Sequence, residues 1–79
     1  MAAEKRSKRD LVLETLVEPD MIRMGDFGEL LAVKFYTETP MGEKFLIVAY
    51  REVSAEDGFV LTAYLARRPS TRRETVWRR

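Results

Sequence analysis

Three long runs of strand-forming residues, separated by short turns, constrain the fold of this chain more than any other feature. The runs cover residues 29–38, 44–53 and 59–66, and each is rich in β-branched, aliphatic and aromatic side chains. The turns between them, 39–42 and 54–58, contain the Pro, Gly and Asp-Gly that reversals favour. Parallel strands need a long crossover connection, so strands joined by such short turns pair antiparallel. The sequence therefore predicts an antiparallel meander.

A short helix is predicted ahead of these strands. Ser7 followed by Asp10 has the form of a capping box, and apolar residues then recur at helical spacing until Pro19 ends the pattern. The helix should run from Lys8 to Val17, which is too short to be stable without a sheet to pack on. The predicted fold class is α+β, with this N-terminal helix packed on one face of a three- to four-stranded antiparallel sheet and the other face partly open.

The chain has 79 residues, which leaves room for one domain. Residues 1–6 are small or charged and are expected to be disordered. Met21–Met24 reads as a short strand, and residues 70–79 are either an Arg-rich tail or an edge strand that includes Trp77. No linker or repeat divides the sequence.

The composition excludes several kinds of chemistry. The chain has neither Cys nor His, so it has no disulfide, no zinc finger, no imidazole base and no cysteine nucleophile. No metal site and no cofactor is predicted. No apolar run approaches the ~20 residues that span a bilayer, so a membrane partner is not expected and the expected location is cytoplasmic.

The charge is distributed unevenly along the chain. The net charge is +1, but all of the positive excess lies in residues 67–79, where the cations are all Arg. The guanidinium group matches a phosphate bidentately, which favours an anionic partner such as nucleic acid. A solvated tail that raises solubility is an equally good interpretation of the same residues.

Four motifs carry a resemblance to a known group of proteins. They are TLVEPDMI at 15–22, LIVAY at 46–50, DGFVLTAYLARR at 57–68 and the closing Val76-Trp77. In this pattern the chain resembles small bacterial and archaeal domains of the Barnase–EndoU–colicin–RelE-like (BECR) nuclease fold group. The resemblance implies a fold in which a helix packs on an antiparallel sheet, and it implies an RNA-directed activity. For a toxin of this group it also implies a small antitoxin-like protein partner. Family members often carry a His-containing segment ahead of the helix, which this chain lacks.

The candidate site follows from the resemblance together with the basic and aromatic residues of the strands. For cleavage without imidazole, Lys34 would act as base or electrostatic partner, Tyr64 as stacking residue or acid, and Arg67 as phosphate clamp. If Lys34, Arg51 and Tyr64 share the open face, they form a cationic and aromatic surface suited to RNA. The predicted nucleic-acid-binding residues are Arg51, Thr62, Arg67, Arg68, Arg72, Arg73 and Trp77.

Each of these residues also has a purely structural interpretation. Lys34 and Arg51 could pair with carboxylates on neighbouring strands, Tyr64 could be a half-exposed sheet residue, and Trp77 could close the core.

Two functions therefore stay open. The first is an RNA-binding protein or a metal-independent endoribonuclease of the RelE-like kind. The alternative is a non-enzymatic interaction module that forms a homodimer or a hetero-complex. That module would use an edge strand, either Met21–Met24 or the segment near Trp77.

Overall fold

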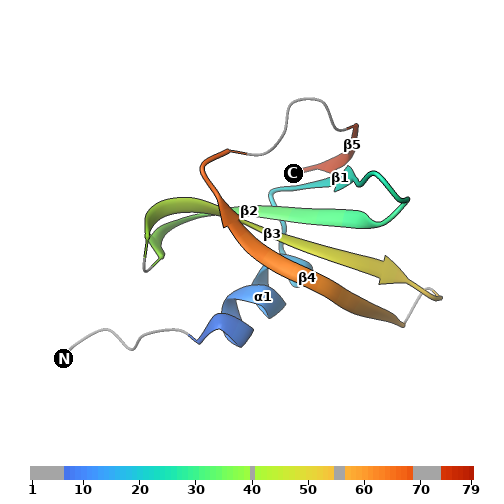
Figure 1. The fold of residues 1–79 in the computed structure, drawn as a ribbon, viewed down its shortest axis with the longest axis horizontal. Coiled ribbons are helices and arrows are strands. Elements are labelled where there is room, and N and C mark those ends of the chain that lie inside the picture. Colours follow the sequence, from blue (N-terminus) through green and yellow to red (C-terminus); the bar gives the residue numbers. More distant parts are fainter. Residues whose placement is uncertain (1–6, 40, 55–56, 69–73) are drawn as a thin grey trace.

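A computed structural model of the protein describes residues 7–39, 41–54, 57–68 and 74–79. These residues form one helix followed by five strands (Figure 1): α1 (Lys8–Val17), β1 (Met21–Met24), β2 (Leu30–Thr39), β3 (Gly42–Glu52), β4 (Gly58–Ala66) and β5 (Thr75–Arg78). The α+β class and the antiparallel sheet are as predicted. Arg72 and Arg73 lie outside the described residues.

The bounds of α1 follow from local capping. The backbone N–H of Asp10 donates to Ser7 Oγ at 3.1 Å, which satisfies one of the free donors of the first turn. At the other end the N–H of Glu18 donates to Glu14 O at 2.8 Å, and Pro19 prevents a further turn. The predicted helix is confirmed at both ends.

The sheet has five strands in the order β4-β3-β2-β1-β5, and every neighbouring pair is antiparallel. The predicted sheet of three to four strands is smaller than the five-stranded sheet of the structure, in which β5 returns to pair with β1. For the same reason the prediction that Met21–Met24 is an edge strand is wrong: β1 pairs with β2 on one side and β5 on the other. The edges are β4 and β5, so the predicted edge near Trp77 is confirmed.

The sheet has apolar side chains on both faces. On the face that carries α1, here called the helix-side face, Ala32, Leu46 and Val48 pack against Leu11, Val12 and Leu16 of the helix. On the opposite face, here called the open face, Leu31, Val33, Ile47 and Ala49 form a second buried cluster. Figure 1 shows α1 against one side of the sheet. The strands β2 and β3 are thus apolar on both faces.

A buried polar cluster fixes α1 on β2. Thr15 is fully buried, and its hydroxyl donates to Leu11 O at 2.7 Å and lies 3.0 Å from the Tyr36 hydroxyl. The Tyr36 hydroxyl also lies 2.9 Å from Glu14 Oε1 and 3.2 Å from Leu11 O. Tyr36 therefore ties the helix to the sheet through polar contacts as well as packing.

A β-bulge in β4 changes which side chains share a face. Thr62 pairs with Ala49 and Val60 pairs with Tyr50, so Leu61 has no partner on β3. The extra residue shifts the alternation by one position. Phe59 therefore lies on the open face with Thr62 and Tyr64, whereas strict alternation would place it on the opposite face.

Among the described residues no helix is long and apolar enough to cross a membrane.

Candidate nucleic-acid interface

The positions of the open face that pair across the ladders combine aromatic and cationic side chains without acidic ones, whereas Glu43 and Asp57 lie on the same face beyond these pairs. Residues that pair across an antiparallel ladder share a face, so the register assigns fifteen paired residues to the open face. Three of them are Arg, four are aromatic and none carries a carboxylate. The Arg residues are Arg23, Arg51 and Arg78, and the aromatic residues are Phe35, Phe45, Phe59 and Tyr64.

Three of the four aromatic rings are accessible. The exposed fractions of Phe35, Phe59 and Tyr64 are 41%, 51% and 45%. Phe35 lies beside Phe45, with ring centroids 5.0 Å apart and planes tilted by 57°. Phe45 packs against the buried aliphatic cluster and Tyr64 pairs with Ile47 of that cluster, so the face offers flat apolar surfaces on which a planar group can stack.

The three Arg residues of this face differ in their surroundings. Arg51 is exposed, and its guanidinium donates to Phe27 O at 2.9 Å, which holds it near the β1–β2 turn. Arg78 is exposed opposite Met21, at the other side of the sheet. Arg23 is 8% exposed and its Nε lies 3.2 Å from Met21 Sδ. Arg51 and Arg78 are therefore the two that can reach a bound anion directly.

Lys34 does not lie on this face. It pairs with Leu46, which belongs to the helix-side cluster, whereas Tyr64 pairs with Ile47 of the open-face cluster. Its ammonium donates to Glu18 O at 2.8 Å and lies 3.8 Å from Asp20 Oδ1, at the C-terminal end of α1. That position suits a cation, because the last carbonyls of a helix lack intrahelical partners. The structure therefore separates Lys34 from Tyr64 by the thickness of the sheet.

The remaining predicted residues fall into two places. Thr62 and Tyr64 share the open face with Arg51, while Arg67 and Arg68 are exposed just beyond the end of β4. Trp77 pairs with Ile22 and lies on the helix-side face. It lines a groove of about 500 Å³ with Leu16, Val17, Glu18, Pro19, Ile22 and Arg79. Trp77 therefore belongs to a different surface from Tyr64.

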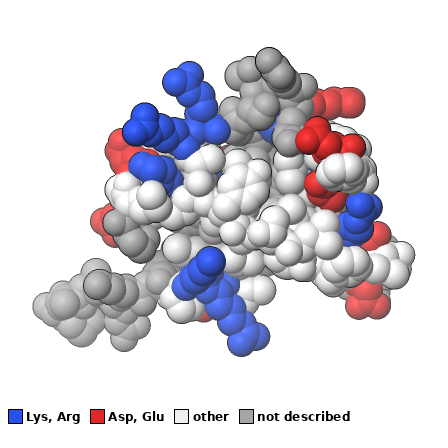
Figure 2. All heavy atoms as spheres, in the orientation of Figure 1, with Lys and Arg blue, Asp and Glu red and all other residues white. Residues whose placement is uncertain are grey.

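Figure 2 shows where charged side chains lie on one face of the molecule. The middle of the visible face is mostly uncharged; Asp and Glu lie mainly at the right, while Lys and Arg lie mainly at the upper left and the lower middle. Among the described residues no group of three His, Cys, Asp or Glu side chains is placed to hold a metal ion.

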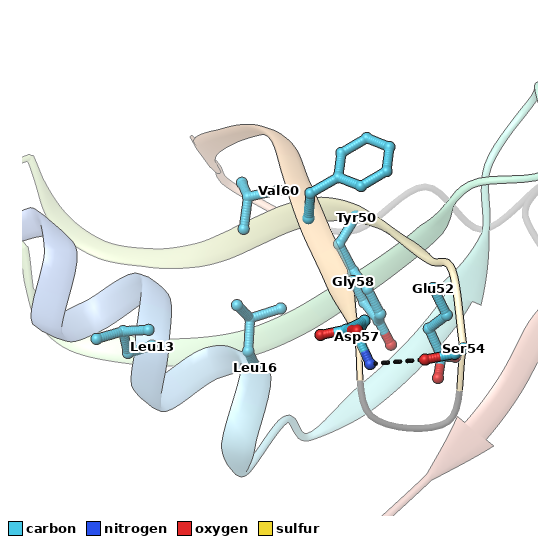
Figure 3. A pocket seen from close by; sticks show the side chains of 9 residues that line it. Leu13, Leu16, Tyr50, Glu52, Ser54, Asp57, Gly58 and Val60 are labelled. Atoms are coloured by element: carbon cyan, nitrogen blue, oxygen red, sulfur yellow. Dashed lines mark hydrogen bonds between the residues drawn. The ribbon is translucent and has the colours of Figure 1, made fainter.

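A second groove, of about 510 Å³, lies between α1 and β4 (Figure 3). Leu13 and Leu16 line it from the helix, and Tyr50, Val60 and Asp57 line it from the strands and the β3–β4 turn. Burial, and secondarily the charge of Glu52, raises the pKa of Tyr50 above its usual value of 10.0. Tyr50 thus stays protonated at neutral pH and cannot act there as a base.

Sequence reasoning missed Arg23 and the aromatic residues Phe35, Phe45 and Phe59. The side of β1 on which Arg23 lies could have been predicted, because residues two apart on a strand share a face and Arg23 follows the apolar Met21 by two residues. Phe59 could not, because its face depends on the bulge at Leu61.

Comparisons with protein-family models, with curated proteins and with solved structures found no match to this chain.

Proposed function

We propose that the protein binds single-stranded RNA on the open face of its sheet. The observation that carries this proposal is the composition of the face: three Arg, four aromatic residues and no carboxylate among its paired residues. The chain as a whole has 13 acidic against 14 basic residues, so the absence of acids from these paired positions is selective. Single strands bind sheets of this kind because bases stack on aromatic rings while cations track the phosphates.

The geometry supports binding better than cleavage. A metal-independent ribonuclease needs a base, an acid and a cation around one phosphate. Lys34 and Tyr64 lie on opposite faces, and Lys34 is engaged at the end of α1. A relationship to BECR-like nucleases, proposed from the sequence motifs, would then be that of a relative that binds RNA without cutting it.

The test is the binding of a labelled single-stranded RNA, followed by fluorescence anisotropy over a range of salt concentrations. Binding should weaken with salt, with a logarithmic slope of about −0.7 for each phosphate contact. Arg51→Ala should lower the affinity and reduce that slope by roughly one contact. Arg9→Ala is the matched control, because Arg9 is exposed on α1 and distant from the open face.

Substitutions at Tyr64 distinguish a stacking role of its ring from a proton-transfer role of its hydroxyl. Tyr64→Ala should cost about 1–3 kcal/mol of binding free energy, which is typical of one stacked base. Tyr64→Phe keeps the ring and should bind like the wild type. Equal affinity of all variants, or no binding at low salt, would contradict the proposal. Cleavage that is lost in Tyr64→Phe would show an enzyme instead.

The alternative function, a non-enzymatic interaction module, has one specific observation in its favour. The edge strand β4 is long and exposed, and five large apolar or aromatic residues project from it or the adjoining helix: Leu13, Phe59, Val60, Leu61 and Tyr64. This edge is independent of the Arg residues that support RNA binding.

A further inference from the structure

The two edges of the sheet are not equally protected against pairing. An edge strand exposes a row of backbone donors and acceptors, which proteins protect with short strands, charges or proline. β5 has four residues, includes Arg78 and is followed by Arg79. β4 has nine residues and contains neither a charge nor a proline. The edge that is open to pairing is therefore β4.

We infer that β4 pairs antiparallel with β4 of a second copy of this chain, which joins the two sheets into one of ten strands. The inference does not rest on RNA binding. Each copy of β4 has one unpaired backbone edge, since β4 pairs only with β3 among the described strands. A two-fold axis perpendicular to the sheet would pair the free backbone groups of both β4 edges with each other, and the assembly would close at two copies.

The side chains of β4 restrict the register of this pairing. Phe59, Thr62, Tyr64 and Ala66 lie on the open face, and Val60, Ala63 and Leu65 lie on the helix-side face. Opposed residues of two strands must share a face. With Ala63 opposite its own counterpart, Leu65 meets Val60 and Ala66 meets Phe59, while the bulge of each strand lies opposite Tyr64.

Charge selects the same register. Continuing the ladder outward brings Arg68 of each copy opposite Asp57 of the other, on the open face. Among the described residues neither side chain forms an ion pair within its own chain, and both are exposed. A two-fold ladder centred on Tyr64 would instead place no carboxylate opposite Arg68. The positive end of β4 is thus complementary to its own acidic start, which favours a second copy as the occupant.

The helix contributes to the same interface. The two-fold axis places both copies of α1 on one side of the joined sheet. Leu13 is 48% exposed beside Val60, at the mouth of the groove in Figure 3. Leu13 would then approach the second copy, which removes apolar surface from water on the helix side as well.

The first test is sedimentation equilibrium over a roughly hundredfold range of protein concentration, up to about 1 mM. A monomer–dimer equilibrium is expected, without larger species. Leu61→Lys places a charge in the pairing edge and should raise the dissociation constant at least about tenfold. Val76→Lys is the matched control on β5, because Leu61 and Val76 are 47% and 50% exposed; it should leave dimerisation unchanged.

The second test examines the register. Asp57→Arg and Arg68→Asp should each weaken the dimer, and the double variant should restore it. Because the chain has no Cys, single cysteines report on proximity without interference. Ala63→Cys should form a disulfide between copies under mild oxidation, and Ala66→Cys should not.

A protein that stays monomeric at every concentration would overturn the inference. So would a dimer that Val76→Lys dissociates and Leu61→Lys does not, since that result assigns the interface to β5. Cross-linking by Ala66→Cys in preference to Ala63→Cys would refute the register. The cysteine test needs no charged substitution in β4, so it decides the matter even if Leu61→Lys fails to fold.

Discussion

Replacing Tyr36 by Phe tests how α1 is held on the sheet. The hydroxyl of Tyr36 lies 2.9 Å from Glu14 Oε1, 3.0 Å from Thr15 Oγ1 and 3.2 Å from Leu11 O. It has one proton, so it can donate to only one of these oxygens at a time. Thr15 already donates to Leu11 O, which leaves the Glu14 carboxylate as the strongest acceptor for Tyr36.

The expected cost follows from that geometry. A hydrogen bond to a charged group contributes about 1.5–3 kcal/mol, and a neutral bond about 0.5–1.5 kcal/mol. The Phe ring fills the same space, so packing is retained. We expect Tyr36→Phe to lower the free energy of unfolding by about 1–3 kcal/mol. In a domain of this size each kcal/mol lowers Tm by roughly 4–8 °C.

Urea denaturation followed by far-UV circular dichroism measures this loss, with an unchanged m-value as the sign that only stability changed. Tyr64→Phe is the matched control, because the Tyr64 hydroxyl has no hydrogen bond to the described residues; its effect should stay within about 0.5 kcal/mol. A double-mutant cycle with Thr15→Val should give a coupling energy of about 0.5–3 kcal/mol. Equal stability of Tyr36→Phe and Tyr64→Phe would refute the assigned role of the polar cluster.

Two further predictions concern the β3–β4 hairpin. Because the pKa of Tyr50 is raised by burial and by Glu52, the folded protein keeps this proton to higher pH than the unfolded chain; the resulting stability is complete below pH 10.0 and is lost as pH rises through the folded pKa. Alkaline titration of the phenolate absorbance should contain a late component that is missing in Tyr50→Phe, and its presence in both proteins would contradict the assignment. Gly58→Ala should destabilise the protein by about 1–3 kcal/mol, because the new Cβ would lie 2.7 Å from Arg51 O, a backbone atom that cannot move alone. Thermal melting measures this cost, and a change below about 0.5 kcal/mol would show that the hairpin yields at little expense.

Local patterns predicted the elements of the fold well. Ser7, Asp10 and Pro19 define both ends of α1, since capping and termination depend on neighbours within one turn. Simple alternation along residues 30–36 puts Val33 and Lys34 on opposite sides of β2, and the two core clusters follow this alternation. Tight turns predicted the meander from β2 to β4.

Long-range pairing and one irregularity could not be predicted in this way. That β5 lies beside β1 depends on contacts between segments more than fifty residues apart, for which a four-residue strand carries no signal. The face of Phe59 depends on the unpaired Leu61, which no alternation reveals. For the candidate site, Arg51, Thr62 and Tyr64 do share a face, whereas Lys34 lies on the other.

The position of β5 also has a consequence for the order of folding. Ile22 pairs with Ala32, which lies ten residues further along the chain, and with Trp77, which lies 55 residues further. The entropy of closing a loop grows with its length, so the β1–β2 hairpin should form well before the β1–β5 ladder. Until β5 arrives, the outer edge of β1 is a vacant strand position that a β5 from another molecule could fill. Exchange of β5 between copies is therefore the misfolding route to which this topology is most exposed.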